Sequence, residues 1–134
     1  MLLTDEHLRE YFEDILGETT ELARFIGRVE NGKIIGVAAV FNFDGHTCEV
    51  GWAGDRGWIT RGFMILLTDY IYRQLGCVRC TSLIEAKNEH AVKQAEKIGF
   101  VLEGCIREGA PSGDVLVYGM LEKEFRYGRF TGRR

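Results

Sequence analysis

The first residues of the chain repeat apolar side chains every three or four positions, which is the spacing of an amphipathic helix. The pattern covers residues 4–16, where Thr4 can cap the first turn and Gly17 can end the helix. The stripe consists of Leu8, Tyr11, Phe12, Ile15 and Leu16. We therefore expect this helix to place one face against a hydrophobic core.

Three runs with strand character follow the helix, at about residues 24–30, 33–42 and 46–53. The pairs Asn31-Gly32 and Asp44-Gly45 separate them, and both pairs are strong signals for tight turns. The three runs therefore predict an antiparallel meander.

Side chains in the third of these runs alternate between two chemical types. One face carries Cys48, Val50 and Trp52, and the other carries Thr47, Glu49, Gly51 and Ala53. Glu49 is thus predicted to lie opposite the bulky core residues.

The second half of the chain alternates between helical and strand patterns. Thr60 is the expected N-cap of a helix over residues 61–75, which ends at Gly76. A strand over residues 77–86 follows, and then a short helix between Asn88 and Gly99. Two strands, over residues 100–107 and 113–122, complete the pattern. The order αβββαβαββ predicts one mixed α/β (α+β) domain over residues 1–134, with three main helices and about six strands.

The strands at 46–53 and 77–86 are joined through a helix, so we expect them to be parallel neighbours. The carboxyl ends of such strands are where an α/β sheet places its functional site. The helix over 61–75 begins at this edge, and its free N–H groups can bind a phosphate or pyrophosphate.

Composition limits the classes of protein that fit. The chain has 134 residues, a formal net charge of −3 and no apolar run long enough to cross a membrane, so we expect a cytoplasmic protein without a nucleic-acid partner. Residues 126–134 are expected to form a frayed basic tail. Strand alternation points Cys77 and Cys80 to opposite faces, and the histidines lack ligand spacing, so no metal is expected.

Several segments together resemble the GNAT N-acetyltransferase superfamily. They are RGFMILLTDYIYRQLG at 61–76, Asn88, EKIGFVLEG at 96–104 and GDVLVYGML at 113–121. The resemblance is to the branch that includes ribosomal-protein N-terminal acetyltransferases. The segments at 58–61 and 110–114 are similar to small GNAT proteins common in phage and prophage genomes.

This resemblance implies a donor, acetyl-coenzyme A, and direct transfer of its acetyl group to an amine within a ternary complex. It also implies that the strands at 46–53 and 77–86 splay apart around the pantetheine arm, while the pyrophosphate lies on a helix start. The cofactor-binding residues implied in this way are Ala53, Trp58, Ile59, Thr60, Arg61, Gly62 and Asn88.

The acceptor ammonium must lose a proton before it can attack, so an N-acetyltransferase needs a base. Glu49 aligns with a glutamate in the related strand and is our first candidate, with Asp55 as the alternative. The family tyrosine that serves as proton donor is Ala95 here, and Tyr118 is a candidate replacement. The glycines of the family pyrophosphate loop are also missing from the segment 58–60.

Two other functions stay open at this point. One is a GNAT-fold binding or accessory module that has lost catalysis, in which Trp58 would plug a collapsed cleft. The other is an unrelated nucleotide-binding domain, which would hold a phosphate without a strand splay. The acceptor is equally open among a protein N-terminus, a lysine, a polyamine-like metabolite and a modified base. The last strand could pair with a partner chain in a homodimer.

Overall fold

A computed structural model describes residues 5–16 and 23–126 of the chain. The elements are α1 (Asp5–Leu16), β1 (Arg24–Glu30), β2 (Lys33–Phe41), β3 (Thr47–Gly54), α2 (Arg61–Asp69), a π-helical turn η1 (Tyr70–Gln74), β4 (Arg79–Glu85), α3 (Glu89–Ile98), β5 (Val101–Ala110), β6 (Gly113–Leu121) and a 3-10 turn η2 (Glu122–Glu124). The predicted order αβββαβαββ is confirmed. The expected cap Thr4, the expected stop Gly17 and most of the basic tail lie outside the described residues.

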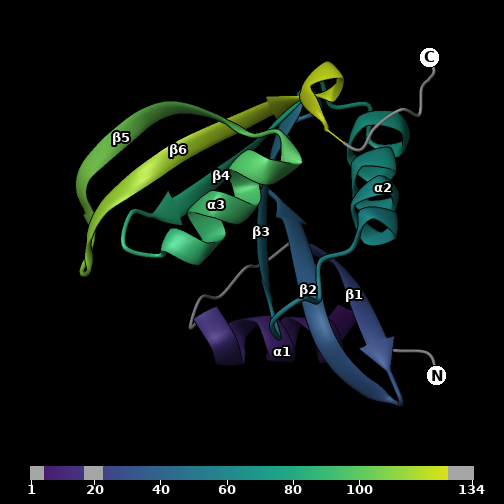
Figure 1. Ribbon diagram of the computed structural model, residues 1–134. Helices are drawn as coiled ribbons and strands as arrows, with labels where there is room; N and C mark the ends of the chain where they lie inside the picture. Colours follow the sequence, from purple (N-terminus) through teal and green to yellow (C-terminus); the bar gives the residue numbers. More distant parts are fainter. Residues whose placement is uncertain (1–4, 17–22, 127–134) are drawn as a thin grey trace.

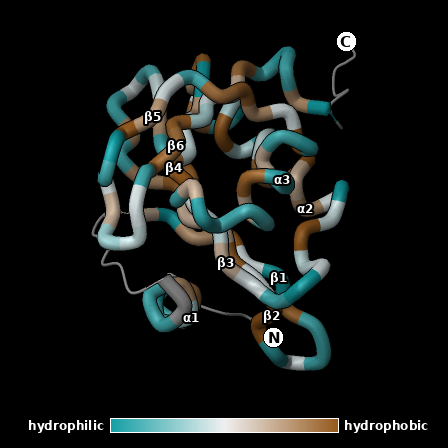
Figure 2. The backbone as a smooth tube through the Cα atoms, turned by 60° about the vertical axis from the view of Figure 1, so that its left-hand side comes forward, coloured by the Kyte–Doolittle hydropathy of each residue, from teal (hydrophilic) through white to brown (hydrophobic). Residues whose placement is uncertain are grey.

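The strands form one six-stranded mixed sheet in the order β1-β2-β3-β4-β6-β5 (Figure 1). The predicted parallel pair, β3 and β4, lies at its centre, and all other neighbours are antiparallel. Figure 2 shows hydrophobic stretches of β4 and β6 side by side within this sheet. Strand direction therefore alternates across the sheet except at the β3–β4 boundary, where two neighbouring strands run the same way.

Helices cover both faces of the sheet. The larger core lies under α2 and α3 and includes Val40, Cys48, Val50, Phe63, Ile71, Ile84, Ile98, Tyr118 and Met120. The smaller core lies under α1, which packs on β1, β2 and β3, and includes Leu8, Phe12, Phe25, Val37, Ala39 and Ala53. Side-chain alternation along β2 and β3 supplies both cores from the same strands.

The two predicted turns of the meander are present but differ in geometry. Asn31 and Gly32 adopt φ angles of 52° and 77°, the left-handed pair that a two-residue hairpin requires. The turn around Asp44 is longer, because its carboxylate accepts hydrogen bonds of 2.8 Å from the amides of His46 and Thr47. These bonds, that of Thr47 first, hold the pKa of Asp44 below its usual value.

The helix after Thr60 begins as predicted, since the Thr60 hydroxyl accepts a hydrogen bond of 3.2 Å from the amide of Phe63. Leu66 is an apolar residue of this helix that lies outside the core, since its side chain is 54% exposed. Leu66 lies two residues from both Met64 and Thr68, which are buried, and two residues correspond to about 200° around a helix. Leu66 therefore points away from the core.

The strand predicted over residues 77–86 starts later, at Arg79. Cys77 consequently precedes the strand, and its thiol lies in the same core cluster as Cys80. The expectation that the two thiols point to opposite faces is therefore wrong, because strand alternation does not apply to Cys77.

Trp58 is the residue that joins the loop after β3 to the sheet. Its side chain is 3% exposed and lies over Gly36 and Gly54, with its ring centroid 4.9 Å from that of Phe63. The Arg28 guanidinium donates a hydrogen bond to the Trp58 carbonyl. The absence of side chains at two facing glycines thus makes room for an indole ring.

This packing predicts that Gly36→Ala destabilises the fold. A Cβ at this position would lie 2.0 Å from the Trp58 ring, and overpacking of this kind costs about 1–3 kcal/mol. Urea denaturation followed by circular dichroism measures the loss. Gly104→Ala is the matched control, since a Cβ there meets nothing within 4 Å. Equal unfolding free energies for the two variants would contradict the packing argument.

Candidate active site

β3 and β4 run side by side for only three residues. The partners are Thr47 with Arg79, Cys48 with Cys80, and Glu49 with Thr81. Beyond Glu49, β3 continues to Gly54 alongside β2, and β4 continues to Glu85 alongside β6. The predicted splay is therefore present. It excludes the alternative of an unrelated nucleotide-binding domain, because that domain would hold a phosphate without a strand splay.

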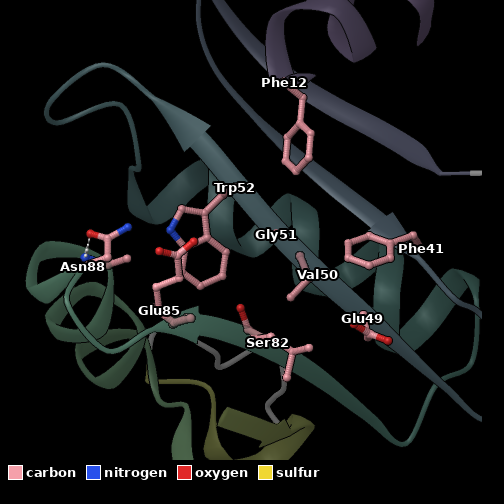
Figure 3. Close-up of a pocket in the computed structure, with 12 residues that line it drawn as sticks. Phe12, Phe41, Glu49, Val50, Gly51, Trp52, Ser82, Glu85 and Asn88 are labelled. Carbon is pink, nitrogen blue, oxygen red and sulfur yellow. Dashed lines mark hydrogen bonds between the residues drawn. The ribbon is translucent and has the colours of Figure 1, made fainter. Parts of the chain in front are cut away.

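A cavity of about 250 Å³ occupies the opening, and we call it the splay pocket (Figure 3). Its lining residues are Phe12, Phe41, Glu49, Val50, Gly51, Trp52, Ser82, Leu83, Ile84, Glu85, Asn88 and Ala91. Phe12 belongs to α1 and Ala91 to α3, which cover opposite faces of the sheet. The pocket therefore connects the two faces through the gap between the strands.

The backbone of β3 presents hydrogen-bonding groups to this gap, but not at the predicted residue. The Asp55 amide donates to the Ile35 carbonyl on the β2 side (2.8 Å), and backbone groups alternate in direction along a strand. The amide of Ala53 therefore also points to β2, where Val37 is its partner. The backbone groups that face the splay belong to Trp52 and Gly54, one residue on either side of Ala53, while Ala53 itself lines a neighbouring pocket.

Glu49 lies where the sequence predicts, on the face of β3 opposite the larger core and in the lining of the splay pocket. Its carboxylate accepts a hydrogen bond of 2.7 Å from the side-chain amide of Asn42. Asp55, the alternative base, lies beyond the end of β3 and outside this pocket's lining. The hydroxyl of Tyr11 bonds to Asp55, and burial together with the nearby carboxylate raises the pKa of Tyr11.

Sequence reasoning missed two polar residues of the splay pocket, both on β4. Ser82 is 2% exposed, its hydroxyl points into the pocket, and it has no hydrogen-bond partner among the described residues (Figure 3). Glu85 lines the same pocket and accepts a hydrogen bond of 2.5 Å from the hydroxyl of Ser112. The apolar run that predicts this strand carries no local signal that its polar members face a cavity.

The start of α2 supplies most of the predicted amide cradle. The amides of Ile59, Thr60, Arg61 and Gly62 have no partner in the part of the chain that the structure describes. Consecutive free N–H groups at a helix start form a site of positive potential. Arg61 is exposed beside them.

Trp58 does not belong to this cradle. Its amide donates to the Asp55 carbonyl at 3.1 Å, and its ring is buried against Gly36 and Gly54. The indole therefore neither plugs the splay nor faces it, and the collapsed cleft that the binding-module alternative requires is not present in the described structure.

Two further cavities continue the splay pocket along α3. The middle pocket, about 160 Å³, shares Trp52, Asn88 and Ala91 with the splay pocket. The basic pocket, about 360 Å³, shares His90 and Gln94 with the middle pocket. Together they form a groove that leads from the strand splay to the loop before α2.

The far end of the groove is positively charged. The basic pocket is lined by Arg56, Gly57, Ile59, His90, Lys93, Gln94, Lys97 and Ile98, with no acidic residue among them. His90 and Lys93 belong to α3 and line this pocket together with Arg56 from the loop before α2. Helical spacing alone does not reveal that these two distant segments face one cavity.

Asn88 joins the splay pocket to the middle pocket. Its side-chain oxygen caps α3 by accepting a hydrogen bond of 3.2 Å from the amide of Ala91. Its NH₂ group has no partner among the described residues, so it can donate into the groove. The indole N–H of Trp52 donates a hydrogen bond of 3.1 Å to the side chain of Gln94, and this bond links β3 to α3 across the middle pocket.

The position of the family tyrosine offers no proton donor, because Ala95 is fully buried in the larger core. Tyr118 is buried as well, and its hydroxyl donates to Glu96 at 2.7 Å. Burial, followed by the bond to Glu96 and its charge, raises the pKa of Tyr118 to about 12. The Tyr118 hydroxyl is therefore bonded to α3, and Tyr118 does not line the splay pocket.

None of the four thiols lines the groove. Cys48, Cys77 and Cys80 are buried, and desolvation raises the pKa of each, in the case of Cys80 to about 12. These thiols are protonated at neutral pH and are poor nucleophiles. No group of three or more histidine, cysteine or acidic residues suited to a metal ion occurs within the described ranges.

Comparison with known families identifies the family of this fold. The profile of the acetyltransferase (GNAT) domain matches residues 2–101 of the chain. The chain belongs to the GNAT acetyltransferase family. It is thus an N-acetyltransferase that depends on acetyl-coenzyme A.

Individual GNAT relatives are distant. The uncharacterized N-acetyltransferase YnaD of Bacillus subtilis is 23% identical over 132 residues, which cover 92% of this chain and 78% of the relative. Ribosomal-protein-S5-alanine acetyltransferase from Vibrio fischeri has a TM-score of 0.65 and 21% identity, over 78% of this chain and 64% of its own. The F149A mutant of spermidine N-acetyltransferase SpeG from Vibrio cholerae has a TM-score of 0.65 and 20% identity. The match covers 87% of this chain and 74% of the SpeG chain. These likenesses confirm the fold.

Within the described residues, no helix combines the length and apolar character of a membrane span. The cytoplasmic location, the phage origin, the extent of the single domain, the homodimer and the lack of a nucleic-acid partner stay predictions.

The bond between Tyr118 and Glu96 predicts a structural role for this phenol in the GNAT enzyme. Tyr118→Phe should lower the free energy of unfolding by about 1 kcal/mol and change kcat by less than about threefold. A pKa of about 12 keeps the phenol neutral from pH 6 to 10, so the pH profile of kcat should also stay unchanged. Urea denaturation and steady-state rates across that range measure both. Loss of a basic limb in the profile would instead identify Tyr118 as the acid.

Proposed function

We propose that this GNAT enzyme transfers the acetyl group directly to an amine acceptor in a ternary complex at the splay pocket. The observation that carries the proposal is the parting of β3 from β4 after three residue pairs. It leaves the backbone groups of Trp52 and Gly54 without a neighbouring strand, beside a cavity that contains Glu49. An extended molecule with amide groups can occupy the place of the missing strand.

The pantetheine arm of acetyl-coenzyme A has this extended, amide-bearing character. In the proposed complex it lies along β3, where Trp52 and Gly54 offer backbone groups and Asn88 offers its NH₂ group. The pyrophosphate then reaches the free amides of residues 59–62 and the guanidinium of Arg61. The basic pocket provides further positive charge for phosphate groups.

The cradle does not need the family glycines at residues 58–60. Glycines serve such a loop by letting a phosphate approach the backbone closely. Here the amides of residues 59–62 are already free, and the bulky Trp58 ring is turned into the core rather than toward the cradle. Because the Trp58 ring packs in the core, it does not obstruct the approach of a phosphate to these amides.

Glu49 is proposed as the base. It accepts a proton from the acceptor ammonium, directly or through one water, and the neutral nitrogen attacks the thioester carbonyl carbon. The C–N bond forms, the C–S bond breaks with its electron pair on the sulfur, and the second proton that the nitrogen loses passes to the departing thiolate or to water. The hydrogen bond from Asn42 holds the Glu49 carboxylate in place without neutralising its charge.

Ser82 is proposed to assist the departing sulfur. Its hydroxyl is buried, faces the splay pocket and lacks a protein partner, so it can donate a hydrogen bond to a developing negative charge. A strong acid is not required, because a free thiol has a pKa near 8.5 and its thiolate is a good leaving group. Direct transfer is favoured over an acyl-enzyme, because no cysteine of the described chain lines the groove and no histidine lines the splay pocket to activate the Ser82 hydroxyl.

Replacing Arg61 or Lys93 by alanine should weaken acetyl-coenzyme A binding about tenfold, the usual effect of one lost hydrogen bond to a charged group. Isothermal titration of acetyl-coenzyme A into each variant measures the change in Kd. Lys123→Ala is the control, because Lys123 is exposed on η2 and lies outside all three pockets. An unchanged Kd in both test variants would refute the proposed phosphate site.

Glu49→Gln should lower kcat at pH 7 roughly 100-fold, the lower range for loss of a general base. The deficit should shrink as the pH rises, since the acceptor amine then loses its proton to solvent. Steady-state rates from pH 6 to 10 measure this dependence, and titration with acetyl-coenzyme A should give the wild-type Kd. A variant with full activity at pH 7 would exclude Glu49 as the base.

A further inference from the structure

Two carboxylates line the splay pocket, and neither has a cationic partner among the described residues. Glu49 is bonded to the side-chain amide of Asn42 and Glu85 to the hydroxyl of Ser112, both of which are neutral donors. These bonds orient the carboxylates and leave their negative charges uncompensated. No basic side chain belongs to the lining of this pocket.

The two carboxylates lie on the same face of the sheet. Glu49 is the register partner of Thr81, and Glu85 follows four residues later on β4, so both side chains point toward the α1 side. Four residues of a strand span about 13 Å. Figure 3 places Glu49 and Glu85 toward opposite ends of the pocket.

Between the two carboxylates the pocket surface is largely apolar. Leu83, which is 49% exposed, lies on β4 between them, and the aromatic rings of Phe12 and Phe41 line the α1 side. Ser82 adds the one buried hydroxyl without a partner that points into the cavity. A ligand that fits would therefore combine an apolar chain with a positive charge at each end.

Charge at a longer range favours the same ligand. Helix α1 overlies this face and carries five acidic residues against one arginine, Arg9. The basic pocket, at the opposite end of the groove, contains Arg56, Lys93 and Lys97 and no acidic residue in its lining. Fields of opposite sign direct an anionic donor to one end of the groove and a cationic acceptor to the other.

We infer that the acceptor is a linear polyamine, an aliphatic chain with ammonium groups about 10–13 Å apart, which is comparable with the strand length that separates the two glutamates. One amine lies beside Glu49 and receives the acetyl group, while the distant ammonium pairs with Glu85. This inference rests on the proposed function, because it assigns the acceptor of the same pocket. A protein N-terminus brings a single ammonium and would use one carboxylate only.

Two acceptors that differ by one ammonium group test the inference: 1,8-diaminooctane and octylamine, with spermidine as a natural polyamine. For the full-length enzyme, kcat/KM should be at least about tenfold higher for the diamine, because a charge-assisted contact contributes at least that factor. Glu85→Gln should remove this preference through a higher KM for the diamine and spermidine. The rate with octylamine and the Kd of acetyl-coenzyme A should not change.

Glu108→Gln is the matched control, because it removes the same charge from β5 outside the pocket and should keep the diamine preference. Turnover of octylamine or an alanine-initiated peptide at the diamine rate, or an unchanged preference in Glu85→Gln, would overturn the inference and leave the proposed function intact. Acetyl-coenzyme A binding without transfer to any of these amines would overturn the proposed function, and the inference with it.

Discussion

The short parallel contact between β3 and β4 is the constraint on which the site depends. Each strand keeps an antiparallel neighbour on its outer side, β2 for β3 and β6 for β4, so both stay in the sheet after they part. Parting leaves unpaired only the inner backbone groups, such as those of Trp52 and Gly54. Such groups must find water or a ligand, because an unpaired buried amide is costly. The sheet thereby contains a binding edge at its centre.

Packing around the splay keeps this edge open. The Trp58 ring fills the space over Gly36 and Gly54, so the loop after β3 is held against the sheet and away from the gap. The bond between Trp52 and Gln94 ties the β3 side of the groove to α3. Because α1 and α3 support opposite faces, the strands have a core on both sides, and this packing holds each strand on its own side of the gap.

Sequence patterns predicted the order of elements, the parallel pair and the caps Thr60 and Asn88, because these depend on local spacing. The position of Glu49 followed from strand alternation for the same reason. Alternation describes side chains and says nothing of which neighbour a backbone amide faces, so it could not predict that the amide of Ala53 points to β2 and those of Trp52 and Gly54 to the splay. Glu85 was missed because its position in the cavity depends on where two distant strands separate.

The distance between the two carboxylates matters for the chemistry. A carboxylate beside an ammonium stabilises the charged form, which opposes the loss of the proton that attack requires. At about 13 Å in water, the interaction between two unit charges is only about 0.3 kcal/mol. In the proposed complex, a cation held at Glu85 can therefore stay protonated with little effect on the amine at Glu49, which gives its proton to the carboxylate. One acidic residue could not hold a cation and accept a proton from the same molecule at once.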